Sequence, residues 1–147
     1  MGDIFFDSNV LLYIHDRSNS SKIEMATRWL ARVSLYQSAV TNLQVLNEVT
    51  NVLFKRRRDL ATEAVFSIID NFAYMGASPL TWPEVLTART LRTSTGYSWW
   101  DCLLLASALE LGCSHFLSED LQDGQQIGDM TIINPFLHAP EDIFRPD

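Results

Sequence analysis

The stretch Ile4-Phe5-Phe6-Asp7-Ser8-Asn9-Val10-Leu11-Leu12-Tyr13 places an acid between two apolar segments. The first three residues predict a short buried strand, and the run that begins at Val10 predicts a short helix. Asp7 therefore falls just past the carboxyl end of a strand. It could simply cap the helix that follows, but ligands of open parallel sheets also gather at this edge.

The rest of the chain repeats this alternation of short apolar segments and helices. Further strands are predicted at 38–40, 115–117 and 131–133. Capping-box spacings at Ser21, Thr41, Thr81 and Ser98 predict helix starts near residues 22, 42, 82 and 99, and one more helix is predicted from about 60 to 74. This alternation predicts an α/β sandwich with a mostly parallel central sheet.

Length and composition narrow the class of protein. A chain of 147 residues with 47% apolar residues predicts one globular domain that spans residues 1–147. No apolar run approaches the roughly 18 residues of a membrane span, and no signal segment opens the chain, so we expect a cytoplasmic protein with no membrane partner. The net charge of −7 counts against nucleic-acid binding over the whole surface. The run Lys55-Arg56-Arg57-Arg58 is a local exception that suits a helix end or a basic rim.

Three other acids share the apolar setting of Asp7. Glu48 lies inside a helical stretch, Asp101 lies between Trp99-Trp100 and an apolar run, and Asp120 follows a predicted strand. Local capping accounts for Asp7, Asp101 and Asp120, but not for Glu48, which is seven residues past Thr41. Helical geometry turns Asp101 along its apolar stripe and Glu48 toward the shoulder of its own. We expect the four carboxylates to face one cleft.

A cleft lined by carboxylates suits hard divalent cations such as Mg²⁺ and Mn²⁺, which take oxygen ligands. Two such ions about 4 Å apart activate a water and stabilise the leaving oxygen of a phosphodiester. Four neighbouring carboxylates also repel, so at least one should have a raised pKa, and a divalent metal should raise the melting temperature. No histidine or thiol cluster, serine triad or glycine-rich phosphate loop offers another chemistry.

The ordered motifs resemble those of PIN-domain nucleases, particularly the toxin component of VapBC-type toxin–antitoxin pairs. The resemblance covers nearly the whole chain. It rests on the segments Phe5–Tyr13, Leu46–Val49, Trp100–Ala108, Phe116–Gln125 and Asn134–Phe136. One departure is Asp123-Gly124, where the family often has Asp-Phe.

This resemblance implies a PIN domain with a Rossmann-like central, mostly parallel sheet of short strands flanked by helices on both faces. It implies a Mg²⁺- or Mn²⁺-dependent endoribonuclease toxin that cleaves RNA phosphodiester bonds with a metal-activated water. It also implies a homodimer that a cognate small antitoxin neutralises. The motifs leave open whether one or two ions are bound and which RNA is cut.

Carried over residue by residue, the resemblance assigns both catalysis and metal binding to Asp7, Glu48, Asp101 and Asp120. Asn9 and Ser118 would be polar groups around this site, and Asp123 could replace or supplement Asp120. The cationic side chains that could hold the RNA backbone are Lys55, Arg56, Arg57, Arg58, Arg89 and Arg92.

Two alternatives compete with this interpretation. A haloacid-dehalogenase-like phosphatase would use Asp7 as its nucleophile, although Asn9 stands where that class usually has an acid–base aspartate, and only Lys22 or Lys55 could supply its lysine. An inactive partner-binding PIN module would instead receive an arginine or lysine of the antitoxin in its acidic pocket.

Overall fold

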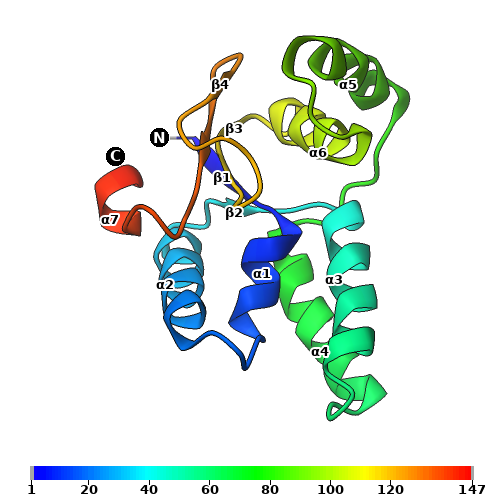
Figure 1. Cartoon of the computed structure of the whole chain (residues 1–147), viewed down its shortest axis with the longest axis vertical. Coiled ribbons are helices and arrows are strands. Elements are labelled where there is room, and N and C mark those ends of the chain that lie inside the picture. The colour runs from blue at the N-terminus through cyan, green and yellow to red at the C-terminus, as the bar shows by residue number, and fades with distance from the viewer. Residues whose placement is uncertain (1, 147) are drawn as a thin grey trace.

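The chain alternates short strands and helices as its sequence predicts. The structure, a computed structural model, describes residues 2–146. In chain order the elements are β1 (Asp3–Phe6), α1 (Ser8–Ile14), α2 (Ser20–Leu35), β2 (Ala39–Val40), α3 (Leu43–Arg56), α4 (Thr62–Phe72), the 3₁₀ turn η1 (Ala73–Met75), α5 (Trp82–Thr95), α6 (Trp99–Glu110), β3 (Cys113–Leu117), β4 (Gln126–Ile127), β5 (Met130–Ile133) and α7 (Pro140–Ile143) (Figure 1).

One five-stranded sheet, in the order β2-β1-β3-β5-β4, forms the centre of the molecule. β2, β1, β3 and β5 are parallel, whereas the two-residue β4 forms an antiparallel hairpin with β5. The carboxyl ends of the four parallel strands therefore share one edge of the sheet. Asp7 directly follows β1 there, and Ser118 directly follows β3.

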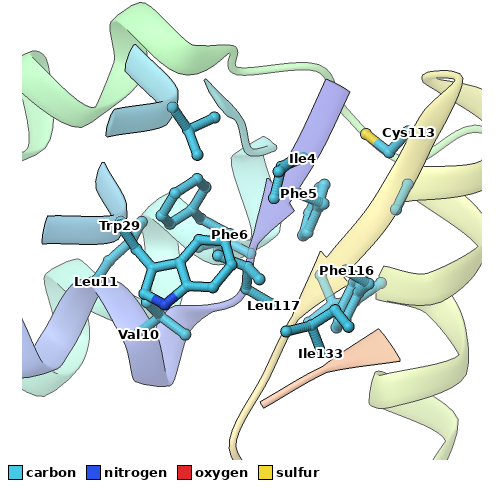
Figure 2. Packing of buried hydrophobic residues seen from close by; sticks show 14 of the residues in the cluster. Ile4, Phe5, Phe6, Val10, Leu11, Trp29, Cys113, Phe116, Leu117 and Ile133 are labelled. Atoms are coloured by element: carbon cyan, nitrogen blue, oxygen red, sulfur yellow. The ribbon is translucent and has the colours of Figure 1, made fainter. Parts of the chain in front are cut away.

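Ile4, Phe5 and Phe6 of β1 are all fully buried. Since successive side chains of a strand point to opposite faces, both faces of the sheet are covered there. On one face, Phe5 stacks on Phe116 of β3, with ring centroids 5.1 Å apart and an interplanar angle of 6°. Figure 2 shows Phe6 on the other side of β1, with Trp29 and Leu11. Burial on both faces explains why β1 is a continuous apolar run rather than an alternating one.

Different helices cover the two faces. α1 packs against α2 and α3, whereas α6 packs against β3 and α5 (Figure 1). Trp29 of α2 is fully buried, and its indole Nε1 donates to the carbonyl oxygens of Pro135 at 2.8 Å and His138 at 3.0 Å. The segment after β5 is thereby fixed to α2. The predicted α/β architecture, with a mostly parallel sheet between helices, is confirmed.

Two helices begin with caps other than the predicted ones. Asn19, not Ser21, caps α2, because its side chain accepts a hydrogen bond from the Lys22 N–H at 3.1 Å. At α3 the predicted cap, Thr41, is buried and donates to the Phe6 carbonyl at 3.1 Å instead.

Asn42 caps α3 in its place. Its side-chain oxygen accepts from the N–H of Val45 at 3.0 Å, and its amide nitrogen donates to the Ser107 hydroxyl of α6 at 2.8 Å. All three groups are buried. This buried contact fixes the start of α3 relative to α6.

Neither β4 nor α7 is predicted by the sequence pattern. β4 is two residues long and α7 is four, so neither shows a measurable hydrophobic period. Among residues 2–146, the helices are all too short or too polar to cross a bilayer.

Candidate active site

Asp7 joins the end of β1 to the start of α1, and its side chain is almost fully buried, at 4% exposure. One carboxylate oxygen accepts a hydrogen bond from the N–H of Ser8 at 2.7 Å, so Asp7 does cap α1. The other oxygen accepts from the Ser118 hydroxyl at 2.9 Å and from the Asn9 amide at 3.5 Å. Capping is therefore one part of its role, since the second oxygen faces the end of β3.

The environment of Asp7 disfavours its negative charge. Burial raises the pKa of Asp7 from 3.8 to about 7, and the charges of Glu48 and Asp101 act in the same direction. Hydrogen bonds from Ser118 and Ser8 oppose this effect without cancelling it. A raised pKa is expected from repulsion among the acids, but here burial is the larger cause and the charges of Glu48 and Asp101 are the smaller one. Two acids, Glu48 on α3 and Asp101 on α6, act on this buried carboxylate, so a cation beside it would be favourable.

Asn9 links Asp7 to the loop after β3. Its amide nitrogen donates to the Asp120 carboxylate at 2.9 Å and to the Ser118 hydroxyl at 3.3 Å. Its amide oxygen accepts from the N–H of Glu119 at 3.4 Å. Asp120 is exposed, while Ser118 is fully buried. The structure thus brings Asp7, Asn9, Ser118 and Asp120 into one hydrogen-bonded group at the sheet edge.

Glu48 and Asp101 are half-buried on helices that flank this group. Glu48 accepts a hydrogen bond from the side chain of Gln44, one turn earlier on α3, at 3.2 Å. Asp101, in the first turn of α6, accepts from the hydroxyl of Ser98 at 2.8 Å. Both charges act on Asp7, so the two acids lie near it. Glu48 lines one pocket and Asp120 another, so the convergence of all four carboxylates on one cleft stays a prediction.

Asp123 has partners of its own outside this group. Its carboxylate accepts from the N–H of Asn134 at 2.8 Å and contacts the Nε2 of His138 at 2.8 Å. Although burial acts to raise the pKa of Asp123, these two hydrogen bonds hold it below its usual value. Asp120, and not Asp123, belongs to the hydrogen-bonded group around Asp7.

Sequence reasoning missed one supporting residue, Lys22 of α2. Its ammonium forms an ion pair with Glu119 and donates to the Tyr13 hydroxyl at 3.1 Å. It also lies 4.7 Å from the ring centroid of Tyr13 and 5.1 Å from that of Phe136. Lys22 thereby ties α2 to the loop that carries Asp120. Its position in the first turn of α2 gives no signal of this contact in the sequence.

A pocket of about 530 Å³ extends from this group toward the basic end of α3. Asn9 and Asp120 line it at the acid group, and Arg17, Arg56 and Arg57 line it farther along. Arg57 is held by two hydrogen bonds of 2.9 Å to Asp59 and by one of 2.6 Å to the His15 carbonyl. The pocket therefore joins carboxylates to guanidinium groups.

The remaining predicted basic contacts differ in how available they are. Lys55, Arg56 and Arg58 are exposed and form no ion pair with any residue in the described range 2–146. Arg92 donates to the carbonyls of Gly96 and Tyr97, and so closes the end of α5. Arg89 lies over the Trp82 ring, 4.9 Å from its centroid. Of these five residues, only Lys55, Arg56 and Arg58 could contact a substrate without losing a local contact.

The acid group suits a divalent cation without forming a ready-made cage. Within residues 2–146, no three histidine, cysteine, aspartate or glutamate side chains lie close enough to enclose an ion. Mg²⁺ keeps several waters and needs only one or two direct carboxylate ligands. Asp7, a carboxylate whose pKa is raised by burial and, less strongly, by two other acids, fits that requirement.

These features define a class of protein. The PIN domain family model matches residues 4–122, a range that runs from β1 to the loop after β3 and includes all four acids. The chain belongs to the PIN domain family. A comparison with curated protein sequences gives no significant match.

Three solved structures that are similar in fold are a toxin or toxin–antitoxin complexes. A toxin–antitoxin complex from Klebsiella pneumoniae is similar to 90% of this chain and 98% of its own, with a TM-score of 0.70 and 15% identity. VapC20 of Mycobacterium tuberculosis, a toxin that cleaves the sarcin-ricin loop, is similar over 78% and 87%, with a TM-score of 0.61 and 16% identity. VapBC2 from Rickettsia felis, bound to a DNA fragment of its promoter, is similar over 88% and 96%, with a TM-score of 0.61 and 14% identity. The chain therefore has the fold of VapC-type toxins.

Proposed function

We propose that this PIN domain is a divalent-metal-dependent endoribonuclease, the toxin of a cytoplasmic toxin–antitoxin pair. The observation that carries the proposal is the buried carboxylate of Asp7, on which the charges of Glu48 and Asp101 converge from two other helices. Such a group is costly in a folded protein unless a cation binds there. The similarity in fold to a toxin that cleaves RNA supports the same reaction class.

In this proposal, the residues divide into those that hold the ion and those that orient them. Asp7 and Asp101, with Glu48 and Asp120, would hold Mg²⁺ or Mn²⁺, which when bound supplies an activated water and stabilises negative charge on the phosphodiester. Asn9 and Ser118 keep the carboxylates of Asp7 and Asp120 in fixed orientations through their hydrogen bonds.

The direct test is cleavage of RNA by the purified wild-type protein. We expect cleavage of single-stranded RNA in the presence of Mn²⁺ or Mg²⁺, and none when EDTA removes the metal. Gel electrophoresis of end-labelled RNA measures both. If the folded protein cleaves no RNA with Mn²⁺ present, it is instead the inactive partner-binding module.

The pocket beside Asp120 supplies a path for the RNA backbone. Arg56 lines this pocket and forms no ion pair among the described residues, so it is the best placed of the basic residues to contact a phosphate. Replacing Arg56 by glutamine should weaken binding of all RNA sequences alike. It should also reduce the slope of log K against log salt by about 0.7, the value for one phosphate contact on a single strand.

Anisotropy titrations of labelled RNA at several salt concentrations measure this slope. Arg28→Gln is the matched control, because Arg28 lies on α2, pairs with Glu141 and does not line the pocket. A slope for Arg56→Gln equal to that of the wild type would exclude Arg56 as a phosphate contact.

The proposed partners follow from the same similarities. Two of the similar structures are toxin–antitoxin assemblies, which supports a cognate small antitoxin as the regulator of this chain. We further propose a homodimer, as the resemblance in sequence implies.

No observation favours the phosphatase alternative. Its reaction requires a lysine close to the nucleophilic aspartate. Lys22 is engaged with Glu119 and Tyr13, and Lys55 is exposed in the last turn of α3. Within residues 2–146, neither lysine is hydrogen-bonded to Asp7.

A further inference from the structure

A second pocket, of about 570 Å³, is lined by Glu48 and shares no lining residue with the basic pocket. Its lining comes from α3, from the loop at Pro79 and Leu80, and from Trp100 in the first turn of α6. We call it the Trp100 groove. Its walls are Leu43, Gln44, Asn47, Glu48, Asn51, Pro79, Leu80 and Trp100.

One wall of the Trp100 groove is a polar stripe of α3. Gln44, Asn47, Glu48 and Asn51 follow the spacing i, i+3, i+4, i+7, so they share one face of the helix. The opposite face of α3 is apolar and buried. Asn47 and Asn51 are exposed, and their amides form no hydrogen bond with any residue from 2 to 146. Two amide groups thus face the groove with both donors and acceptors free.

The other wall presents a flat aromatic ring. The side chain of Trp100 is 64% exposed, although a tryptophan normally buries most of its surface. Its ring contacts no other aromatic ring or cation in the part of the chain that the structure describes. A free ring facing free amides matches what an unstacked nucleobase needs, namely one stacking surface and partners for its polar edge.

The groove is continuous with the acid group. Glu48 belongs to both, and Trp100 precedes Asp101 in the first turn of α6. We propose that the Trp100 groove binds an unstacked base of single-stranded RNA next to the phosphate that is cut. Trp100 stacks on the base, and Asn47 and Asn51 bind its edge. This inference rests on the proposed ribonuclease function.

The composition of the groove favours a base over a second copy of the chain. The centre of a protein interface is depleted in charged groups, whereas this groove contains Glu48 and three amide side chains. An amide can bind a base edge through two hydrogen bonds, as asparagine and glutamine do with adenine. The groove therefore also supplies sequence preference, which the basic pocket cannot.

Binding is measured in the Asp7→Asn background, so that the RNA stays intact. The probe is a fluorescently labelled pool of short single-stranded RNAs of random sequence, titrated by anisotropy. Adding Trp100→Ala should weaken binding about 5- to 150-fold, the loss expected for one base–aromatic stack. Trp100→Phe should retain most of the affinity, because it keeps a ring.

Trp82→Ala is the matched control. Trp82 is 59% exposed, lies on α5 and does not line the groove, so its loss should leave RNA affinity unchanged. In the cleaving protein, Asn47→Asp and Asn51→Asp should change which base flanks the cut, as read by sequencing the cleaved ends. This change tests the edge contacts separately from the stack.

Three results would overturn the inference. Equal RNA affinity of the Trp100→Ala and Trp82→Ala variants would overturn the proposal for the Trp100 groove and leave the proposed ribonuclease function unaffected. The Trp100→Ala protein could lose its dimer in size-exclusion chromatography, with RNA affinity falling only in proportion to the loss of dimer. The groove would then be a contact between copies of the chain. A wild-type protein that neither binds nor cleaves RNA would overturn both proposals together.

Discussion

Replacing Asp101 by asparagine should reduce metal-dependent RNA cleavage at least about 100-fold and leave the protein folded. Changing a residue that merely orients a metal ligand costs about 10- to 100-fold in activity, so the loss of a ligand should cost more. The fold should tolerate the change, because asparagine has the same shape and its oxygen can still accept the hydrogen bond from Ser98. Removing a negative charge from the first turn of α6 costs only about 0.3–1 kcal/mol.

This result is measured as the initial rate of cleavage in saturating Mn²⁺, alongside thermal unfolding. Glu110→Gln is the control, since Glu110 is an exposed acid at the far end of the same helix. If Asp101→Asn keeps full activity in a preparation free of other nucleases, Asp101 is not part of the site. If Asp101→Asn unfolds, the metal affinity of the Asp101→Glu variant, which keeps the charge, is measured against that of the wild type instead.

The second large effect concerns stability without metal, which we expect to fall as the pH rises from about 4 to about 7. The folded-state pKa of Asp7 is about 7, above its ordinary value of 3.8, so the folded protein binds this proton more tightly than the unfolded chain does. Below the lower value the carboxyl is protonated in both states and there is no penalty. Between the two values the free energy of unfolding decreases by about 1.4 kcal/mol per pH unit through this group. Above the higher value the penalty is complete.

Asp7→Asn isolates this contribution from those of the other titrating groups. The variant cannot ionise at this position, so it should be more stable than the metal-free wild type at pH 8 and lose that advantage near pH 4. Millimolar Mn²⁺ should stabilise the wild type at pH 8 and have little effect on the variant. Calorimetry in EDTA and in Mn²⁺ across this pH range measures both. A difference between the two proteins that does not change with pH would show that the charge on Asp7 carries no folding penalty.

The sequence is informative about the fold wherever an element has a clear period or cap. β1, β3 and β5 lie where continuous apolar runs predict them, and the capping box at Thr81 is present at the start of α5. The wrong cap at α3 has a tertiary cause. Thr41 has the right spacing for a cap, but its hydroxyl is needed by the Phe6 carbonyl at the sheet edge, so the next residue takes over.

The candidate site is predictable to a similar degree. The direction of a side chain on a helix follows from spacing alone, which is why the approach of Glu48 and Asp101 to Asp7 could be foreseen. The choice between Asp120 and Asp123 as the fourth acid could not be predicted. It depends on the path of the segment after β5. That segment brings Asn134 and His138 to Asp123 and leaves Asp120 to Asn9.

The two pockets cannot be predicted from the sequence. The Trp100 groove needs the loop at Pro79 and Leu80 to run beside α3, and this path is set by a backbone contact between Leu43 and Ser78. No local pattern in the sequence specifies such a contact. The sequence also does not indicate which of its tryptophans is exposed and faces a groove.

The position of β1 between β2 and β3 has a consequence for when the site is completed during synthesis. The hydrogen bond from Ser118 to Asp7 joins residues 111 positions apart, and β1 stays unpaired on its β3 side until Cys113–Leu117 has been made. A growing chain on the ribosome therefore holds its first acid long before the groups that complete the site exist. For the ribonuclease proposed above, RNA cleavage would therefore have to wait until Ser118, Asp120 and the groups around them have been made.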